Sequence, residues 1–155
     1  MTHKTTPTAQ DTIALVVAMS YLSRILYASR SSAQVGADEL NDILEVSRNK
    51  NRLLQITGIL CAGGGHFIQI LEGPQDELIR LYSRILDDPR HYDSVLIGVA
   101  PIQQRIFKSW SMGYIENPPD VMEANRNQLL EMWRGRTEAH QLFTLMREFL
   151  DQLDR

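Results

Sequence analysis

Apolar residues alternate with polar ones, or gather in short runs, in five segments that are typical of β-strands. The first segment, Leu22 to Ser29, places Ile25 and Tyr27 on one face and Leu26 and Ala28 on the other. The pattern predicts four more strands, which are Ile56 to Ala62, His66 to Glu72, Asp93 to Ala100 and Ile106 to Ile115.

Two segments with helical spacing lie between these strands. Gly36 precedes a helix that we expect to begin near Asp38, a favourable N-cap residue. Gly73-Pro74 opens the second helix, with the proline in its first turn. The triple glycine Gly63-Gly64-Gly65 joins the second and third strands and predicts a β-hairpin. The apolar positions at helical spacing are Leu40, Ile43 and Leu44 (followed by Ser47) in the first helix and Leu78, Leu81, Tyr82 and Ile85 in the second.

The resulting order, β-α-β-β-α-β-β, predicts an α+β protein with a ferredoxin-like sheet that carries two helices on one face. After Pro118-Pro119, two apolar stripes flank Gly135 and predict C-terminal helices that cover the other face. The stripes are Leu129, Leu130 and Trp133, then Leu142, Met146, Phe149 and Leu153. We expect three parts: an N-terminal extension over 1–21 that is partly disordered, a domain over 22–116 and a helical appendage over 117–155.

Composition narrows the classes of protein. The chain has 155 residues, is 43% hydrophobic and carries a formal charge of −3, which argues against nucleic acid as a direct partner. The single cysteine, Cys61, excludes an intramolecular disulfide and favours a cytoplasmic location. No apolar run is long enough to predict a membrane helix. The run Ile13 to Met19 is short for a signal peptide and adjoins Asp11, so we favour an element that packs on the fold or on a second copy.

Common catalytic motifs are missing from the sequence. It contains no Walker loop, GxGxxG, nucleophile elbow or HExxH. The four histidines are scattered without zinc-ligand spacing, so no metal site is predicted. We therefore do not expect an enzyme.

Polar residues inside predicted strands are the most informative feature. Gln69 shares a strand face with Phe67 and Leu71, and a buried carboxamide without partners costs about 1–3 kcal/mol. Tyr27 also needs a partner for its phenol. Tyr27 is compatible with an ordinary core, as is the pair Trp110 and Met112 on the fifth strand. Gln69 is harder to explain in that way.

Six short motifs occur along the chain. They are Ile25-Leu26-Tyr27-Ala28-Ser29, Ser47 through Asn51, Ile56-Thr57-Gly58-Ile59-Leu60, Phe67-Ile68-Gln69-Ile70-Leu71-Glu72-Gly73, Asp88-Pro89-Arg90-His91 and Trp110-Ser111-Met112. Each motif is weak alone, but their order and spacing together are specific. In these motifs, across roughly Leu22 to Tyr114, the chain resembles the BLUF family of blue-light receptors that use FAD. The family's ferredoxin-like core agrees with the predicted order of elements.

The resemblance implies roles for particular residues. Tyr27 would donate an electron and a proton on illumination, and Gln69 would be the switching amide between that phenol and the flavin. Asn51 would hydrogen-bond the polar edge of the ring, with Ser47 one turn earlier as a secondary candidate. Lys50, where several relatives carry Asn or His, would touch the carbonyl edge of the flavin or reach water.

The remaining implied residues enclose the flavin or carry the signal. Ile43 and Ile85, from the two helices, would sandwich the isoalloxazine. The residues expected at the ribityl or phosphate end are Arg84, Arg90 and His91. Trp110 and Met112 would couple the pocket to the outside.

The sequence thus predicts a blue-light photoreceptor without a fused catalytic domain, which signals to a separate partner protein. The apolar stripes of the tail favour a homo-oligomer. Two alternatives remain open at this point: a flavin-free ferredoxin-like interaction module, and a small flavin reductase.

Overall fold

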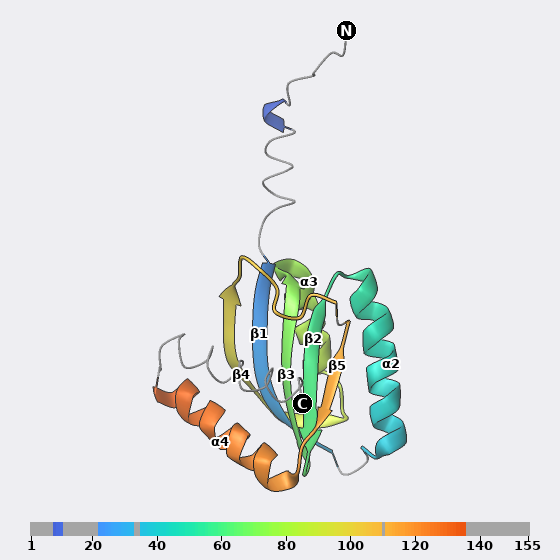
Figure 1. The fold of residues 1–155 in the computed structure, drawn as a ribbon, viewed down its shortest axis with the longest axis vertical. Helices are drawn as coiled ribbons and strands as arrows, with labels where there is room; N and C mark the ends of the chain where they lie inside the picture. Colours follow the sequence, from blue (N-terminus) through green and yellow to red (C-terminus); the bar gives the residue numbers. More distant parts are fainter. Residues whose placement is uncertain (1–7, 11–21, 33–34, 110, 136–155) are drawn as a thin grey trace.

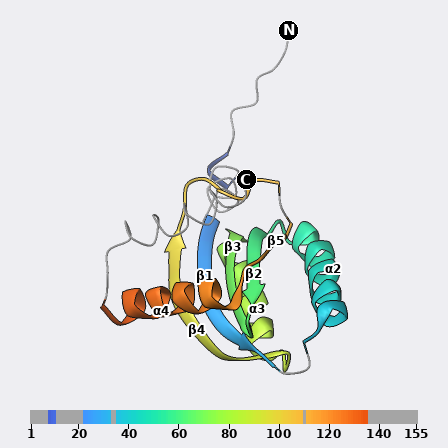
Figure 2. The same cartoon turned by 60° about the horizontal axis from the view of Figure 1, so that its bottom comes forward.

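The computed structural model describes residues 8–10, 22–32, 35–109 and 111–135. Five strands form one sheet, and helices lie against both of its faces (Figures 1 and 2). The strands are β1 (Leu22–Ser31), β2 (Thr57–Gly63), β3 (His66–Pro74), β4 (His91–Pro101) and β5 (Gly113–Glu116). The helices are α2 (Ala37–Leu53), α3 (Gln75–Leu86) and α4 (Pro119–Gly135).

The strands follow the spatial order β4-β1-β3-β2-β5. Strand β1 pairs antiparallel with both β3 and β4, and β2 pairs antiparallel with β3. The order β4-β1-β3-β2, with α2 after β1 and α3 after β3, is the ferredoxin-like arrangement, so the predicted fold class is confirmed. Strand β5 extends the sheet by pairing parallel with β2.

Glycine makes the turn between β2 and β3 possible. Gly64 and Gly65 have φ angles of +58° and +77°, in the left-handed region that disfavours other residues. A Cβ on Gly64 would also lie 2.6 Å from the Cβ of Pro119, where α4 begins. The predicted hairpin is therefore confirmed, and its turn packs against the start of α4.

Alternation along the strands separates two hydrophobic cores. Ile25 and Tyr27 belong to the core beneath α2 and α3, whereas Leu26 and Ala28 belong to the core beneath α4. Figure 2 shows α4 crossing the face of the sheet opposite α3. Helix α4 therefore covers the second face as predicted, whereas the second stripe, 142–153, lies outside the described residues.

The predicted fifth strand is mostly wrong, because β5 contains only four residues. The N–H groups of Ile106 and Phe107 donate to Oε2 of Glu72, at 2.9 and 3.1 Å, instead of to a neighbouring strand. Nδ2 of Asn51 donates a hydrogen bond to the carbonyl oxygen of Ser111, at 2.8 Å. Met112 thus precedes the strand instead of lying on it. Trp110 lies outside the described residues.

Three local predictions also need correction. Helix α2 has Gly36 as its N-cap, and Asp38 falls in the first turn, because the side chain of Glu39 reaches back to accept the cap N–H at 2.9 Å. Pro74 is the N-cap of α3 and ends β3, so it is not in the first turn of the helix. Trp133 is 52% exposed and does not join Leu129 in the core.

The buried thiol of Cys61 should make the stability of the fold depend on pH in the alkaline range. Its side chain is buried beneath α4, and burial raises the pKa of the thiol from 9.0 to about 12. Between these two pKa values the folded protein keeps a proton that the unfolded chain releases. The stability contributed by the buried neutral thiol is therefore full below pH 9 and is lost as the pH rises towards 12. Urea unfolding should show stability falling by about 1 kcal/mol per pH unit from this group. Cys61→Ala should show a shallower slope above pH 9, and an identical slope would contradict the assignment.

Candidate functional site

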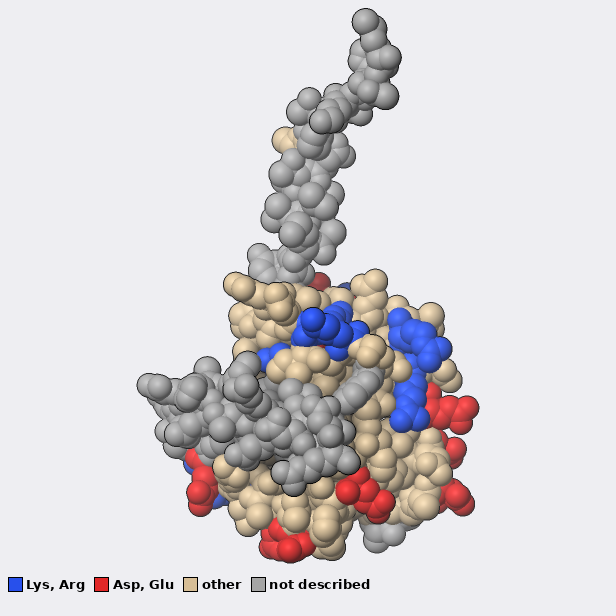
Figure 3. Space-filling view, in the orientation of Figure 1, with Lys and Arg blue, Asp and Glu red and all other residues tan. Residues whose placement is uncertain are grey.

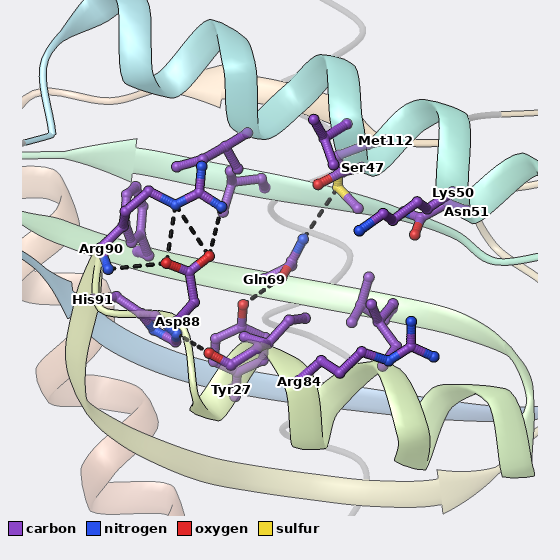
Figure 4. A pocket seen from close by; sticks show the side chains of 17 residues that line it. Tyr27, Ser47, Lys50, Asn51, Gln69, Arg84, Asp88, Arg90, His91 and Met112 are labelled. Atoms are coloured by element: carbon purple, nitrogen blue, oxygen red, sulfur yellow. Dashed lines mark hydrogen bonds and ion pairs between the residues drawn. The ribbon is translucent and has the colours of Figure 1, made fainter.

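A cavity of about 200 Å³ lies between α2, α3 and the sheet. Tyr27 of β1 and Gln69 of β3 form its floor, and Met112 enters it from the segment before β5 (Figure 4). Every residue expected from the sequence to bind a flavin lines this one cavity. The set is Tyr27, Ile43, Ser47, Lys50, Asn51, Gln69, Arg84, Ile85, Arg90 and His91. The structure therefore brings together residues from five separate segments of the chain.

The register of the sheet places Tyr27 beside Gln69. The two residues lie directly opposite each other in the antiparallel pair of β1 and β3, so their side chains point to the same face. The Tyr27 hydroxyl donates a hydrogen bond to Oε1 of Gln69, and Nε2 of Gln69 donates to the sulfur of Met112 at 3.3 Å. A continuous chain of contacts thus links the phenol, the amide and the thioether.

Tyr27 stays protonated at any physiological pH. Its side chain is 4% exposed, and burial is the largest cause that raises the pKa of the phenol above its usual range. The nearby Tyr82 and Asp88 raise this pKa further. The ring of Tyr82 lies 5.2 Å from that of Tyr27. Tyr27 is therefore a hydrogen-bond donor held in apolar surroundings.

Helical spacing explains the polar wall contributed by α2. Ile43, Ser47 and Asn51 recur every four residues, and Lys50 lies three after Ser47, so all four share one face of the helix. Asn51 is 1% exposed, and its Nδ2 donates a hydrogen bond to the carbonyl oxygen of Ser111. One face of α2 thus presents an aliphatic group, a hydroxyl, a carboxamide and an ammonium to the cavity.

A tight charged pair closes the other side of the cavity. Nε of Arg90 lies 2.9 and 3.0 Å from the two carboxylate oxygens of Asp88, and Nη2 lies 2.5 Å from Oδ2. The hydrogen bonds from Arg90 lower the pKa of Asp88 and keep it ionised. His91 contacts the carbonyl oxygen of Ile85 through Nε2.

Two features of this side differ from the sequence-based assignment. Figure 4 shows the Arg84 guanidinium on the opposite side of Gln69 from Arg90 and His91, so these three residues do not line one end of the cavity together. Asp88 lines the cavity but received no role from the sequence. The signal for it was present, since a carboxylate two residues before an arginine in a short loop can form a pair that fixes the arginine side chain.

The lining fits a flat ligand that has one polar edge. Aliphatic groups of Ile43 and Ile85 come from opposing helices, while the carboxamides of Asn51 and Gln69 offer donors and acceptors. The described residues contain no group of three His, Cys, Asp or Glu side chains suited to a metal ion. Fold and pocket together define a ferredoxin-like domain whose cavity has a lining suited to a flat organic ligand.

The family follows from a direct match. The model of the BLUF family, sensors of blue light using FAD, matches residues 22–113, and the chain belongs to this family. The match includes all the residues of the cavity. Because this family is defined by its use of FAD, the cofactor predicted from the sequence is confirmed as a flavin of this kind.

Relatives and solved structures agree with this assignment. The chain is 37% identical to the photoactivated adenylate cyclase subunit beta of Euglena longa, over 60% of this chain and 11% of that protein. It is 32% identical to the blue light- and temperature-regulated antirepressor BluF of Escherichia coli, over 54% and 21%. The chain thus spans about a tenth of the cyclase subunits that it matches.

Two solved structures match most of this chain. The dark state of the BLUF protein BlrB has a TM-score of 0.67 at 28% identity, over 85% of this chain and 96% of that one. The photo-activated state of BlsA also has a TM-score of 0.67 at 28% identity, over 82% and 93%. Among the described helices, none has the length and apolar character needed to cross a bilayer.

Proposed function

We propose that this protein is a blue-light photoreceptor that binds FAD in the cavity and converts photon absorption into a rearrangement of the hydrogen bonds among Tyr27, Gln69 and the flavin. The observation that supports this most directly is the buried bond from the Tyr27 phenol to the Gln69 amide at the cavity wall. A hydrogen-bonded pair in an ordinary core would need no adjoining cavity, whereas a light-driven switch needs both the bonded pair and a cavity for the flavin beside it.

Each wall of the cavity would hold a different part of the flavin. Ile43 and Ile85 would lie on the two faces of the isoalloxazine. Asn51 has two amide hydrogens, and Ser111 takes one, so the other can donate to the polar edge of the ring. Lys50 and Arg84 come from the two helices and would meet the carbonyl edge and the ribityl or phosphate groups. Arg90, held by its ion pair with Asp88, and His91 would contact the flavin from the opposite side of the cavity.

The photochemistry would leave Tyr27 and the flavin chemically unchanged. The bound flavin supplies a strong one-electron oxidant when it absorbs blue light. Tyr27 would give up an electron and its phenolic proton, and would recover both when the charges recombine. During this cycle the Gln69 carboxamide would exchange its hydrogen-bonding roles, either by rotation, which swaps the positions of its carbonyl and amino groups, or by tautomerisation, which moves a proton from nitrogen to oxygen. The net chemistry is zero, and the altered hydrogen-bond pattern is the stored signal.

Met112 would receive this signal. In the structure, the amino group of Gln69 donates to the Met112 sulfur. If the carbonyl group of Gln69 took the place of the amino group, it could not form a hydrogen bond with Met112, because the thioether sulfur has no proton to donate. Exchange of the amide groups would therefore release the segment before β5. Trp110 was assigned the same coupling role and keeps it as a proposal.

Changing Met112 should separate photochemistry from output. One net hydrogen bond is worth about 1 kcal/mol, which is a several-fold change in a local opening equilibrium. Hydrogen exchange of peptides spanning 105–116 should therefore be several-fold faster in the light in the wild type. Met112→Leu preserves the volume but removes the acceptor, and should abolish this difference while keeping the flavin spectral shift. Undiminished light-dependent exchange in the Leu variant would exclude this route.

The output would pass to a separate partner protein. Two relatives are named as a cyclase subunit and an antirepressor, so the same domain serves different outputs in those proteins. The match covers about a tenth of the cyclase subunit, so the catalytic activity in that protein's name is not carried over to this chain. A cytoplasmic location, a homo-oligomeric state and the absence of direct nucleic-acid binding also remain proposals.

Flavin content and reactivity test the proposal against both alternatives. Protein purified in the dark should be yellow and should release about one FAD per chain on denaturation. A colourless protein that does not take up added FAD would favour a flavin-free interaction module. Added NADH should not bleach the bound flavin, since α2 and α3 cover the cavity from both sides. Bleaching by NADH would favour the reductase.

A further inference from the structure

A groove of about 330 Å³ lies beside the cofactor cavity, between the end of α2 and the segment that joins β4 to β5. Its charged lining residues are all cations: Arg52 from the last turn of α2, and Arg105 and Lys108 from the joining segment. Hydroxyl and amide groups of neighbouring residues and the aliphatic Ile56 complete the lining. The groove therefore combines polar and apolar surface, and its charged groups are of one sign.

The positive charge of the groove is not neutralised within the described part of the chain. Arg105 donates to the hydroxyl of Thr57 at 3.0 Å and to the carbonyl oxygens of Gln55 and Glu72 at 2.6 and 3.0 Å, all uncharged acceptors. Arg52 and Lys108 are exposed, and neither takes part in an ion pair among the described residues.

The surrounding surface shows the same separation of charge. Figure 3 shows Lys and Arg side chains gathered over the upper end of α2 and the segment between β4 and β5, with most Asp and Glu side chains lying lower on this face. The whole chain has a net charge of −3, so the charge of this basic patch is opposite in sign to the net charge of the chain. A local field of this kind attracts an oppositely charged partner and orients it.

The groove shares a wall with the cofactor cavity. Asn51 lines both, and its Nδ2 bonds the carbonyl oxygen of Ser111, which also lines the groove. The next residue, Met112, accepts from Gln69 through its sulfur and from Nε of Arg48 through its carbonyl oxygen, at 3.0 Å. An occupant of the groove would therefore touch the segment that the proposed switch releases.

We propose that this groove is the docking site for an acidic segment of a separate partner protein, and that illumination changes its affinity. The inference rests on the function proposed above. Cations from two elements, spaced by neutral donors and acceptors, suit an extended peptide whose carboxylates meet the cations and whose amides meet the hydroxyl and carbonyl groups. Three cations are too few to follow a nucleic-acid backbone over its length.

A labelled hexaglutamate peptide is a direct probe of this groove. Fluorescence anisotropy would follow its binding to the flavin-loaded protein in the dark and under continuous blue light. The double variant Arg52→Glu, Lys108→Glu should weaken binding by at least about tenfold. The matched control, Arg80→Glu with Arg134→Glu, changes the net charge equally at exposed sites on α3 and α4 and should alter binding by less than about twofold.

Salt and light give two further readouts. Raising the ionic strength from about 0.05 to about 0.5 M should weaken binding to the wild type and have little effect on the groove variant. Light should change the dissociation constant of the wild type at least twofold, in line with the loss of one hydrogen bond. Both double variants should keep the flavin spectral shift, because none of the four substituted residues lines the cofactor cavity.

Several outcomes would overturn this inference alone. The first is equal weakening of peptide binding by the groove and control variants, and the second is a wild-type affinity that is the same in light and dark. The third is a groove variant that dissociates a dimer while the wild type binds no peptide, because the groove would then be a contact between two copies of this chain. Each leaves the proposed function intact if the spectral shift persists. A wild type without any spectral shift would instead refute the proposed function.

Discussion

Tyr27→Phe should lose the light-induced spectral shift completely and still bind flavin. The phenol is the only hydrogen-bond donor that the structure aims at Oε1 of Gln69 within the described residues, and it is also the electron source. Phe fills the same volume, so the cavity and its flavin should be preserved. The absorption difference between dark and illuminated samples measures the result.

A second tyrosine provides a matched control. Tyr82 lies 5.2 Å from Tyr27, ring to ring, but its hydroxyl pairs with Oγ of Ser94 at 3.2 Å. Tyr82→Phe should therefore keep the shift. Gln69→Leu should lose it, because an aliphatic side chain offers no amide groups to exchange. A full shift in Tyr27→Phe, or equal losses in Tyr27→Phe and Tyr82→Phe, would contradict the assignment of the photoactive pair.

Glu72→Ala should cause the largest loss of stability, about 3–5 kcal/mol. The Glu72 side chain is fully buried, and Oε1 lies 2.5 and 2.7 Å from two nitrogens of Arg24. Its other oxygen accepts the N–H groups of Ile106 and Phe107. Removing the carboxylate leaves a nearly buried guanidinium without its counterion and two backbone donors without their acceptor. Urea unfolding at fixed flavin concentration measures the change.

An exposed ion pair on the same protein sets the scale for Glu72. Glu77 lies 3.6 Å from Arg80 on the surface of α3, three residues away along the helix. Glu77→Ala should cost less than about 0.5 kcal/mol, because water screens this pair. Comparable losses in the two variants would show that Glu72 does not anchor the segment between β4 and β5.

The alternation of apolar residues was sufficient to predict most of the fold. Ile25 and Leu26 fall in different cores because successive residues of a strand point to opposite faces. The hairpin was predictable because Gly64 and Gly65 can adopt positive φ. The fifth strand was not, because the residues that capture its backbone groups, Glu72 and Asn51, are distant in sequence and leave no local pattern.

The candidate site was predictable from motifs, and its geometry was not. The cofactor-binding residues selected by the resemblance to the BLUF family all line one cavity, whereas Trp110 lies outside the described residues. It grouped Arg84 with Arg90, whereas the direction in which each arginine points depends on packing that the sequence does not specify. The pairing of Arg90 with Asp88 likewise depends on the conformation of one short loop.

The central claim is that a phenol and a carboxamide on adjacent strands control the spectrum of one bound flavin. The most direct test is the visible absorption spectrum of dark-purified wild-type protein, recorded before blue light, directly after it and during recovery in the dark. We predict a small shift to longer wavelength that reverses fully, with the flavin remaining oxidised and bound. An unchanged spectrum, or a bleaching that oxygen alone reverses, would contradict the account.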